Sequence, residues 1–215
     1  MGMPPGTSWN TTQGPLARDA RDAGLVLQAI AGPDGAEVIS LQHDAPNYLA
    51  AIDAGVEGLR MAWSDDFGFT RKYSGPETEQ VFEVATTAAF SFATLGAEVH
   101  RIGESFPEWI GMLDLGLSGH DPAIDAEYLR AQDLRTQWWD GFRRIFKEFD
   151  LLLTPTIQHI AFSIDRWNES WGEGLVEFSA TWCAHTFPHN FLGWPAISVP
   201  CGFVDGMPVS VQICR

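Results

Sequence analysis

The chain has 215 residues, of which 28 are acidic and 13 are basic, so its formal net charge is −15. A negative surface repels the phosphates of nucleic acids and of anionic membranes, and we expect neither as a partner. The hydrophobic content of 45% indicates a packed core and excludes a chain that is disordered throughout.

In the first quarter of the chain, helices are the only regular structure that we predict. Residues 1–14 show no periodicity, and we expect them to form an extended lead-in to a domain that occupies residues 15–215. From Pro15 to the stop at Gly32-Pro33, apolar residues recur at steps of three and four, which predicts a helix with one buried stripe. This stripe comprises Leu16, Ala20, Ala23, Leu27 and Ile30. A short helix is expected near residues 46–54.

A crossover unit follows between residues 59 and 102. Residues 59–64 predict a strand that ends at Asp65-Asp66, and residues 98–102 predict another. Between them a helix is expected at residues 76–95, ended by Gly96. Its stripe comprises Val81, Val84, Ala85, Ala88, Phe92 and Leu95. Two strands joined by a helix predict parallel pairing, hence the α/β class.

The last third predicts a long helix, a buried strand and a hairpin. The helix is expected at residues 127–149, with a stripe of Ala131, Leu134, Trp138, Phe142, Ile145 and Phe149. Residues 150–155, with the apolar run at residues 151–153, are typical of a strand covered on both faces. A helix near residues 181–192 precedes two strands that meet at an Asp205-Gly206 turn. We therefore predict a mixed, largely parallel central sheet flanked by helices.

Several residues suggest chemistry, but each has a structural alternative. His185 and His189 share a helical face as metal ligands do, yet no third ligand is near, which favours ordinary, partly buried histidines. Cys183 is a nucleophile only if a histidine activates it, and otherwise it fills the core. Asp65-Asp66 forms either a carboxylate pair or, more simply, a turn. The aromatic residues between 162 and 194 either line a ligand pocket after a parallel strand or form core.

Seven segments occur in one order along the chain: GPLARD (residues 14–19), IAGPD (30–34), GLRMAWS (58–64), LGAEV (95–99), DLLLTPT (150–156), TFPHN (186–190) and PAISVPCG (195–202). Together they resemble the C-terminal half of the amidase signature family, the serine hydrolases that cleave carboxamides. Trp194 departs from the family's pattern, where a smaller residue is usual, and this leaves the local shape of the pocket open.

The resemblance implies a serine nucleophile, a bridging serine in a cis peptide and a lysine base. It places these groups before the GPLARD segment, where this chain has only a short lead-in. Neither of the chain's two lysines, Lys72 and Lys147, matches the catalytic context, so we predict no catalytic residue here. The resemblance also leads us to expect an incomplete amidase fold with an exposed sheet edge.

We therefore predict the C-terminal portion of an amidase-type hydrolase of carbon–nitrogen bonds, inactive alone, with a small-molecule amide as substrate once completed. Predicted substrate-binding residues are Thr156, Trp182, Cys183 and Phe187, each with a place in the core as its alternative, and no cofactor or metal is expected. One alternative is a non-catalytic binding or complementation subunit that pairs with a separate catalytic chain. The protein partner expected is this complementing chain or a second copy in a homo-oligomer. Another is an independent cysteine or metal hydrolase. Three cysteines without a CxxC pair and no membrane-length apolar run favour a cytoplasmic location.

Overall fold

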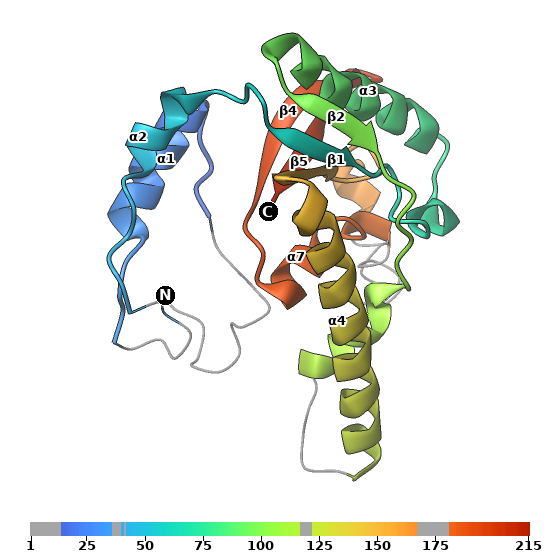
Figure 1. Cartoon of the computed structure of the whole chain (residues 1–215). Helices are drawn as coiled ribbons and strands as arrows, with labels where there is room; N and C mark the ends of the chain where they lie inside the picture. The colour runs from blue at the N-terminus through green and yellow to red at the C-terminus, as the bar shows by residue number, and fades with distance from the viewer. Residues whose placement is uncertain (1–13, 36–39, 41, 117–121, 167–180) are drawn as a thin grey trace. The chain divides into compact units, whose positions relative to one another are not determined.

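A five-stranded sheet with the order β2-β1-β3-β5-β4 organises the larger part of the chain (Figure 1). The computed structural model describes residues 14–35, 40, 42–116, 122–166 and 181–215. The strands are β1 (Arg60–Trp63), β2 (Glu98–Arg101), β3 (Leu151–Pro155), β4 (Ala196–Val204) and β5 (Met207–Cys214). The chain divides into two compact units, Met1–Val56 and Glu57–Arg215, and the sheet belongs to the second.

The predicted crossover unit is confirmed. β1 pairs in parallel with β2 and with β3, so that Met61 lies between Val99 and Leu151. The connection is α3 (Thr78–Ser91) followed by η3 (Phe92–Leu95). Gly96 ends it in the left-handed conformation with φ of 86°, which a glycine adopts without steric cost.

The other half of the sheet is antiparallel, so the sheet is mixed as predicted. β5 pairs with both β3 and β4. Asp205 and Gly206 form the predicted tight turn, with φ of 51° and 76°. Two successive residues with positive φ match the right-handed twist of the two strands that they join.

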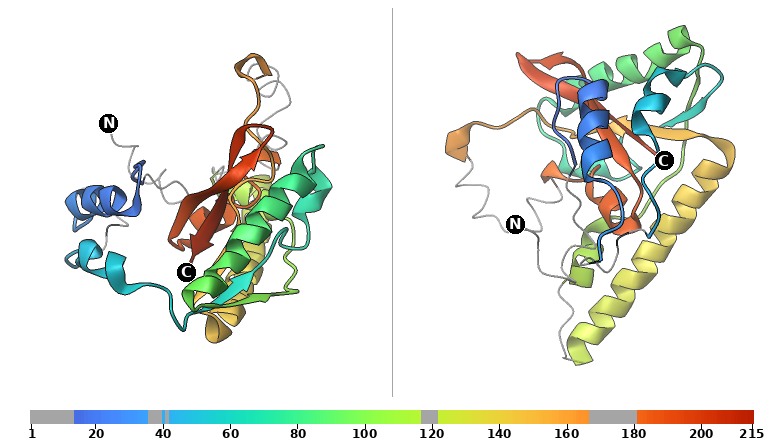
Figure 2. Two further views of the ribbon diagram at one scale, coloured as in Figure 1. Left: turned by 90° about the horizontal axis from the view of Figure 1, so that it is seen from above. Right: turned by 90° about the vertical axis from the view of Figure 1, so that its left-hand side faces the viewer.

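Helices cover both faces of the sheet (Figures 1 and 2). Helix α3 packs on β3, β4 and β5, while α4 (Pro122–Glu148) and α7 (Phe187–Leu192) lie on the opposite face. α3 buries Val81 and Ala85 as predicted, but also Phe82 and Ala89, whereas Leu95 is 61% exposed. The predicted stripe was wrong there because the last turn, η3, is a 3₁₀ helix and changes the direction of its side chains.

The part of the core that helix α4 covers is aromatic. Helix α4 buries Ala131, Trp138, Phe142 and Ile145 of its predicted stripe. The Trp138 and Phe106 rings stack with their centroids 4.4 Å apart. This approach requires Gly141, because a Cβ there would lie 2.3 Å from Phe106 Cε1. The position of helix α4 therefore depends on the close fit between Gly141 and the Phe106 ring as well as on the apolar area that the helix buries.

The first unit is described from residue 14 and consists of α1 (Ala20–Ile30), α2 (Tyr48–Ala51) and η1 (Ile52–Ala54). The expected start of α1 near Pro15 was wrong, because the Asp19 side chain caps the helix by accepting a hydrogen bond from Asp22 N. The expected stripe was also wrong: Gly24 is buried against Leu49 and Ile52, while Leu16, Ala20 and Ile30 are exposed.

β4 is the last strand of the sheet among the described residues. Residues 196–200 are exposed, and they include Ile197 at 47% and Val199 at 39%. The exposed apolar edge that the sequence predicts is therefore present in this part of the structure. No helix in the described part of the chain has the length and apolar character needed to cross a bilayer.

Candidate functional site

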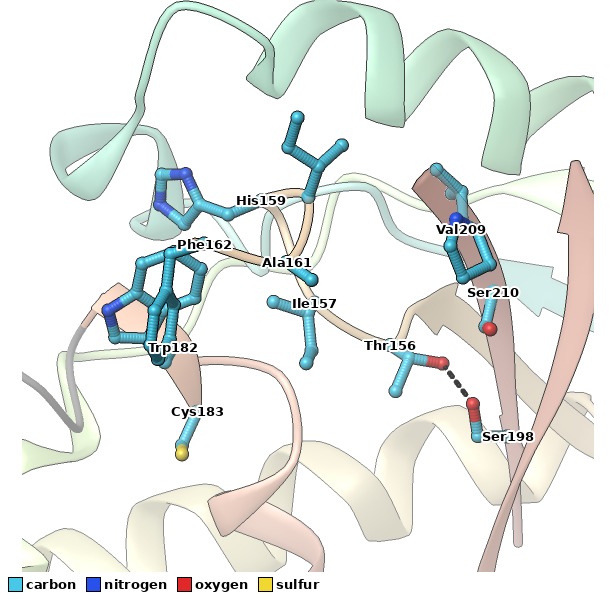
Figure 3. Close-up of a pocket in the computed structure, with 12 residues that line it drawn as sticks. Thr156, Ile157, His159, Ala161, Phe162, Trp182, Cys183, Ser198, Val209 and Ser210 are labelled. Atoms are coloured by element: carbon cyan, nitrogen blue, oxygen red, sulfur yellow. Dashed lines mark hydrogen bonds between the residues drawn. The ribbon is translucent and has the colours of Figure 1, made fainter. Parts of the chain in front are cut away.

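A cavity of about 500 Å³ opens where β3 ends (Figure 3). Its lining residues are Thr156, Ile157, His159, Ile160, Ala161, Phe162, Trp182, Cys183, Ser198, Pro208, Val209 and Ser210. The volume falls within the roughly 300–1,000 Å³ range of small-molecule sites. Its position at the carboxyl end of a parallel strand is the one at which open α/β sheets bind ligands.

One end of the cavity carries hydroxyl groups. Thr156 directly follows β3, and its backbone N–H donates to Ser210 O over 3.0 Å. The side-chain oxygens of Thr156 and Ser198 lie 2.9 Å apart, so one donates a hydrogen bond to the other. A hydroxyl pair can both donate to and accept from a bound carboxamide.

The other end is aromatic, with Ile157 between the two ends (Figure 3). The Trp182 ring lies 4.5 Å from Phe162 and 4.9 Å from His159, measured between centroids. Both Trp182 and Phe162 are half-buried residues. We call these three side chains the aromatic wall.

Within the aromatic wall, the His159 ring is held in place through both of its nitrogen atoms. Its Nδ1 lies 3.1 Å from Glu77 Oε1, and its Nε2 lies 2.9 Å from Tyr73 O. Both ring nitrogens therefore face protein oxygen atoms rather than a bound molecule. A general base needs a free nitrogen, so this arrangement makes His159 part of the wall and not a base.

The structure brings together three of the four residues predicted to bind substrate. Thr156, Trp182 and Cys183 line the cavity, whereas Phe187 packs on Trp109 at a centroid distance of 5.0 Å. Phe162 belongs to the aromatic residues between 162 and 194 that were expected either to line a pocket or to form core, whereas His159, Ser198 and Ser210 were not predicted. Residues 157–162 could have been predicted to line the cavity, because they directly follow β3. Ser198 and Ser210 could not, because their place in the cavity depends on how the strands pair.

Cys183 has no features of an activated nucleophile. Burial raises the pKa of its thiol, which disfavours the reactive thiolate. The neighbouring His185 directs Nε2 to Asp65 O, over 2.9 Å, instead of toward this thiol. The cysteine-hydrolase alternative gains no support from this geometry.

His185 and His189 are more deeply buried than expected, at 0% and 3% exposure. Burial lowers the pKa of His185 to about 4 and that of His189 to about 3, so both are neutral near pH 7. Gln212 Nε2 donates to His189 Nε2 over 2.8 Å and to His185 O over 2.9 Å. Within the described ranges, no group of three or more His, Cys, Asp or Glu could hold a metal ion. These histidines belong to a core network.

Asp65 and Asp66 form a turn, as the simpler interpretation predicts. Asp66 Oδ1 accepts from Gly68 N over 2.8 Å. Asp65 forms ion pairs with Arg101 and with Arg71, which also pairs with Asp66. Carboxylates held by two guanidinium groups serve as structural anchors.

Lys72 lacks the character of a general base. Its Nζ lies 2.8 Å from Glu108 Oε1, and the hydrogen bond to Glu108 is the main cause that raises the pKa of its ammonium group. A lysine base requires the opposite shift, toward neutral pH. Neither the sequence context of Lys72 nor its surroundings in the structure are those of a general base.

Trp194 lies outside the cavity. Its indole stacks on Trp139 at 5.2 Å and packs on Phe146 at 4.9 Å, both on helix α4. The bulky residue therefore fastens the turn after α7 to α4, and it does not line the pocket formed by the described residues.

This fold and cavity define an α/β protein with a cavity of small-molecule size at the carboxyl edge of a mixed sheet. A sequence model of the Amidase family matches residues 103–214, over half of the chain. The chain belongs to this family.

Individual relatives agree with this assignment. The acylamidase of Rhodococcus erythropolis is 32% identical over an alignment of 235 positions, gaps included, which covers 93% of this chain and 47% of that protein. A glutamyl-tRNA(Gln) amidotransferase subunit from Dehalococcoides mccartyi is 27% identical, with coverages of 93% and 50%. The chain thus spans about half the length of the curated relatives it matches.

Solved structures show the same fold. A bacterial aryl acylamidase superposes with a TM-score of 0.71 at 23% identity, covering 94% of this chain and 48% of that one. The glutamyl-tRNA(Gln) amidotransferase subunit from Thermotoga maritima gives a TM-score of 0.72, also at 23% identity, with coverages of 94% and 48%.

Proposed function

We propose that this chain forms one wall of the substrate pocket of an amidase-type hydrolase, which cleaves the carbon–nitrogen bond of carboxamides. The observation that carries the proposal is the cavity at the end of β3, whose hydroxyl pair, Thr156 and Ser198, suits an amide group. Membership of the Amidase family and the likeness to an acylamidase support the reaction class.

The nucleophile and base come from outside the residues that the structure describes. The Cys183 thiol is disfavoured as a thiolate, and Lys72 is tied to Glu108. The chain alone therefore binds an amide but does not hydrolyse it. Thr156, Trp182 and Cys183 contact the substrate in this proposal, while Phe187 lies outside the cavity lining and packs on Trp109.

A mixing experiment tests this proposal. The purified 215-residue chain is assayed for ammonia release from propionamide, alone and after co-expression with the part of the Rhodococcus erythropolis acylamidase that it does not match. We expect no turnover alone and turnover in the mixture. Hydrolysis by the chain alone that persists in Cys183→Ala and in the presence of a chelator would show that a nucleophile within the chain had been missed.

A second candidate is a complementation subunit whose natural partner is a separate catalytic chain. Two of the similar proteins are named as subunits of a larger enzyme, and the exposed apolar edge of β4 offers a place for association. The DNA next to the coding sequence separates the two proposals. A continuous reading frame that encodes the serine and lysine motifs favours a single-chain enzyme, and a separate neighbouring frame favours the complementation role.

A further inference from the structure

We infer that the cavity selects neutral carboxamides that carry an aromatic ring, with the ring against Trp182 and Phe162 and the amide at Thr156 and Ser198. The inference rests on the proposed function, because it names the substrate class of the same cavity.

The aromatic wall supplies the ring site. Phe162 meets Trp182 at 63° and His159 meets it at 49°, so the rings form a corner and not a parallel stack. Aromatic rings prefer edge-to-face and offset contacts, and a flat guest placed in this corner can make one with each ring. Since Trp182 is only half-buried, its side chain has surface left for such a guest.

One side chain of the aromatic wall, His159, is held in a fixed orientation. The His159 side chain is only 6% exposed, and its contacts with Glu77 and Tyr73 O fix the ring orientation. Gln158 Nε2 donates to the same Tyr73 carbonyl over 2.7 Å. Because the His159 ring is already held, its contact with a bound ligand costs no further side-chain entropy at this residue.

The charge of the lining favours an uncharged ligand. Among the described residues that line the cavity there is no Lys, Arg, Asp or Glu, and the ionisable ones are His159 and Cys183. Burial raises the pKa of the Cys183 thiol and so favours its neutral form. Charged amines or carboxylates would lose hydration without gaining an ionic partner.

The hydroxyl pair sets the orientation of the ligand. Thr156 and Ser198 lie at the opposite end from Trp182, with Ile157 between them (Figure 3). A compound with a ring at one end and a primary amide at the other matches this polarity. Phenylacetamide has this form.

Calorimetric titration of the 215-residue chain with phenylacetamide and with cyclohexylacetamide tests the inference. The two differ only in ring saturation, and simple hydrophobic burial favours the larger apolar surface of the cyclohexyl compound. We expect phenylacetamide to bind about tenfold more tightly, because aromatic pairing adds to burial.

Three variants locate the effect. Trp182→Ala should abolish the preference and Trp182→Phe should restore most of it. Trp139→Ala is the matched control, because this half-exposed indole stacks on Trp194 outside the cavity lining and should leave both affinities unchanged. Thermal unfolding of each variant verifies that it is folded.

Any of three results overturns the inference: no binding of phenylacetamide, equal or tighter binding of cyclohexylacetamide, or a preference that survives Trp182→Ala. The proposed function is judged separately by the mixing experiment. Turnover in the mixture together with no ring preference in the titrated chain refutes only the aromatic selection. A ring preference in the titrated chain together with no turnover in the mixture refutes only the amidase proposal.

Discussion

The hydroxyls of Thr156 and Ser198 lie 2.9 Å apart, although 42 residues separate them and their strands are not neighbours in the sheet. Thr156 follows β3 and Ser198 lies on β4, with β5 between the two strands. The pair therefore joins two parts of the cavity lining that the backbone hydrogen bonds do not connect directly.

Thr156→Val should weaken phenylacetamide binding severalfold while changing the free energy of unfolding by no more than about 1 kcal/mol, since a half-exposed hydrogen bond adds little net stability. Calorimetric titration and urea unfolding measure the two effects. Thr87→Val on the exposed side of α3 is the control. Unchanged affinity in Thr156→Val would mean that the hydroxyl pair does not contact the amide.

The buried histidines should make the fold sensitive to mild acid. The folded pKa values of about 4 and about 3 lie below the ordinary value of 6.5, so the unfolded chain binds more protons below pH 6.5. Stability is then fully present above pH 6.5 and falls as the pH drops. By proton linkage, each histidine costs about 2 kcal/mol at pH 5.

Urea unfolding at several values between pH 5 and 7.5 measures this loss. His189→Gln should remove about half of the pH dependence, even though the substitution itself lowers stability. His43→Gln, at an exposed position, should leave the slope unchanged. A slope in His189→Gln equal to that of the parent chain would show that His189 is not buried in its neutral form.

Gly141→Ala should destabilise the protein, although alanine is the better helix former by about 1 kcal/mol. The new Cβ would lie 2.3 Å from Phe106 Cε1, and overpacking of this kind costs typically about 1–3 kcal/mol. Thr136→Ala, at an exposed position of the same helix, should be neutral or slightly stabilising. A higher melting temperature for Gly141→Ala would contradict the close packing of α4 on Phe106.

The exposed edge at β4 should make the isolated chain self-associate, because an apolar edge strand pairs readily with another chain. Ile197→Lys should shift sedimentation toward the monomer, since a charge on the edge opposes pairing. Leu95→Lys tests the specificity of this effect, as Leu95 is 61% exposed but lies outside the strands. If both variants dissociate the assembly equally, general surface hydrophobicity and not the β4 edge drives it.

The sequence predicts the elements that depend on local patterns. The strands at Arg60–Trp63 and Leu151–Pro155 and the helix of the crossover unit follow from apolar periodicity and from Gly96. The hairpin follows from Asp205 and Gly206, whose positive φ angles suit these residue types. The assignment of residues 15–215 to one domain stays a prediction.

The sequence does not predict features that depend on long-range contact. Phe187 was selected for its place in a motif, yet Trp109, 78 residues earlier, determines which way it packs. Ser198 joins the cavity only because β5 brings β4 and β3 together. The start of α1 was misplaced because the Asp19 cap outweighs Pro15 as a start signal.

The tight turn at Asp205-Gly206 has a consequence for folding kinetics. Adjacent segments joined by two residues close on the microsecond timescale, whereas the contact of Arg60 N with Asp150 Oδ2 brings together residues 90 positions apart. Closure of the β4–β5 hairpin is therefore a local step, and we expect the long-range parallel pairing to limit the rate of refolding.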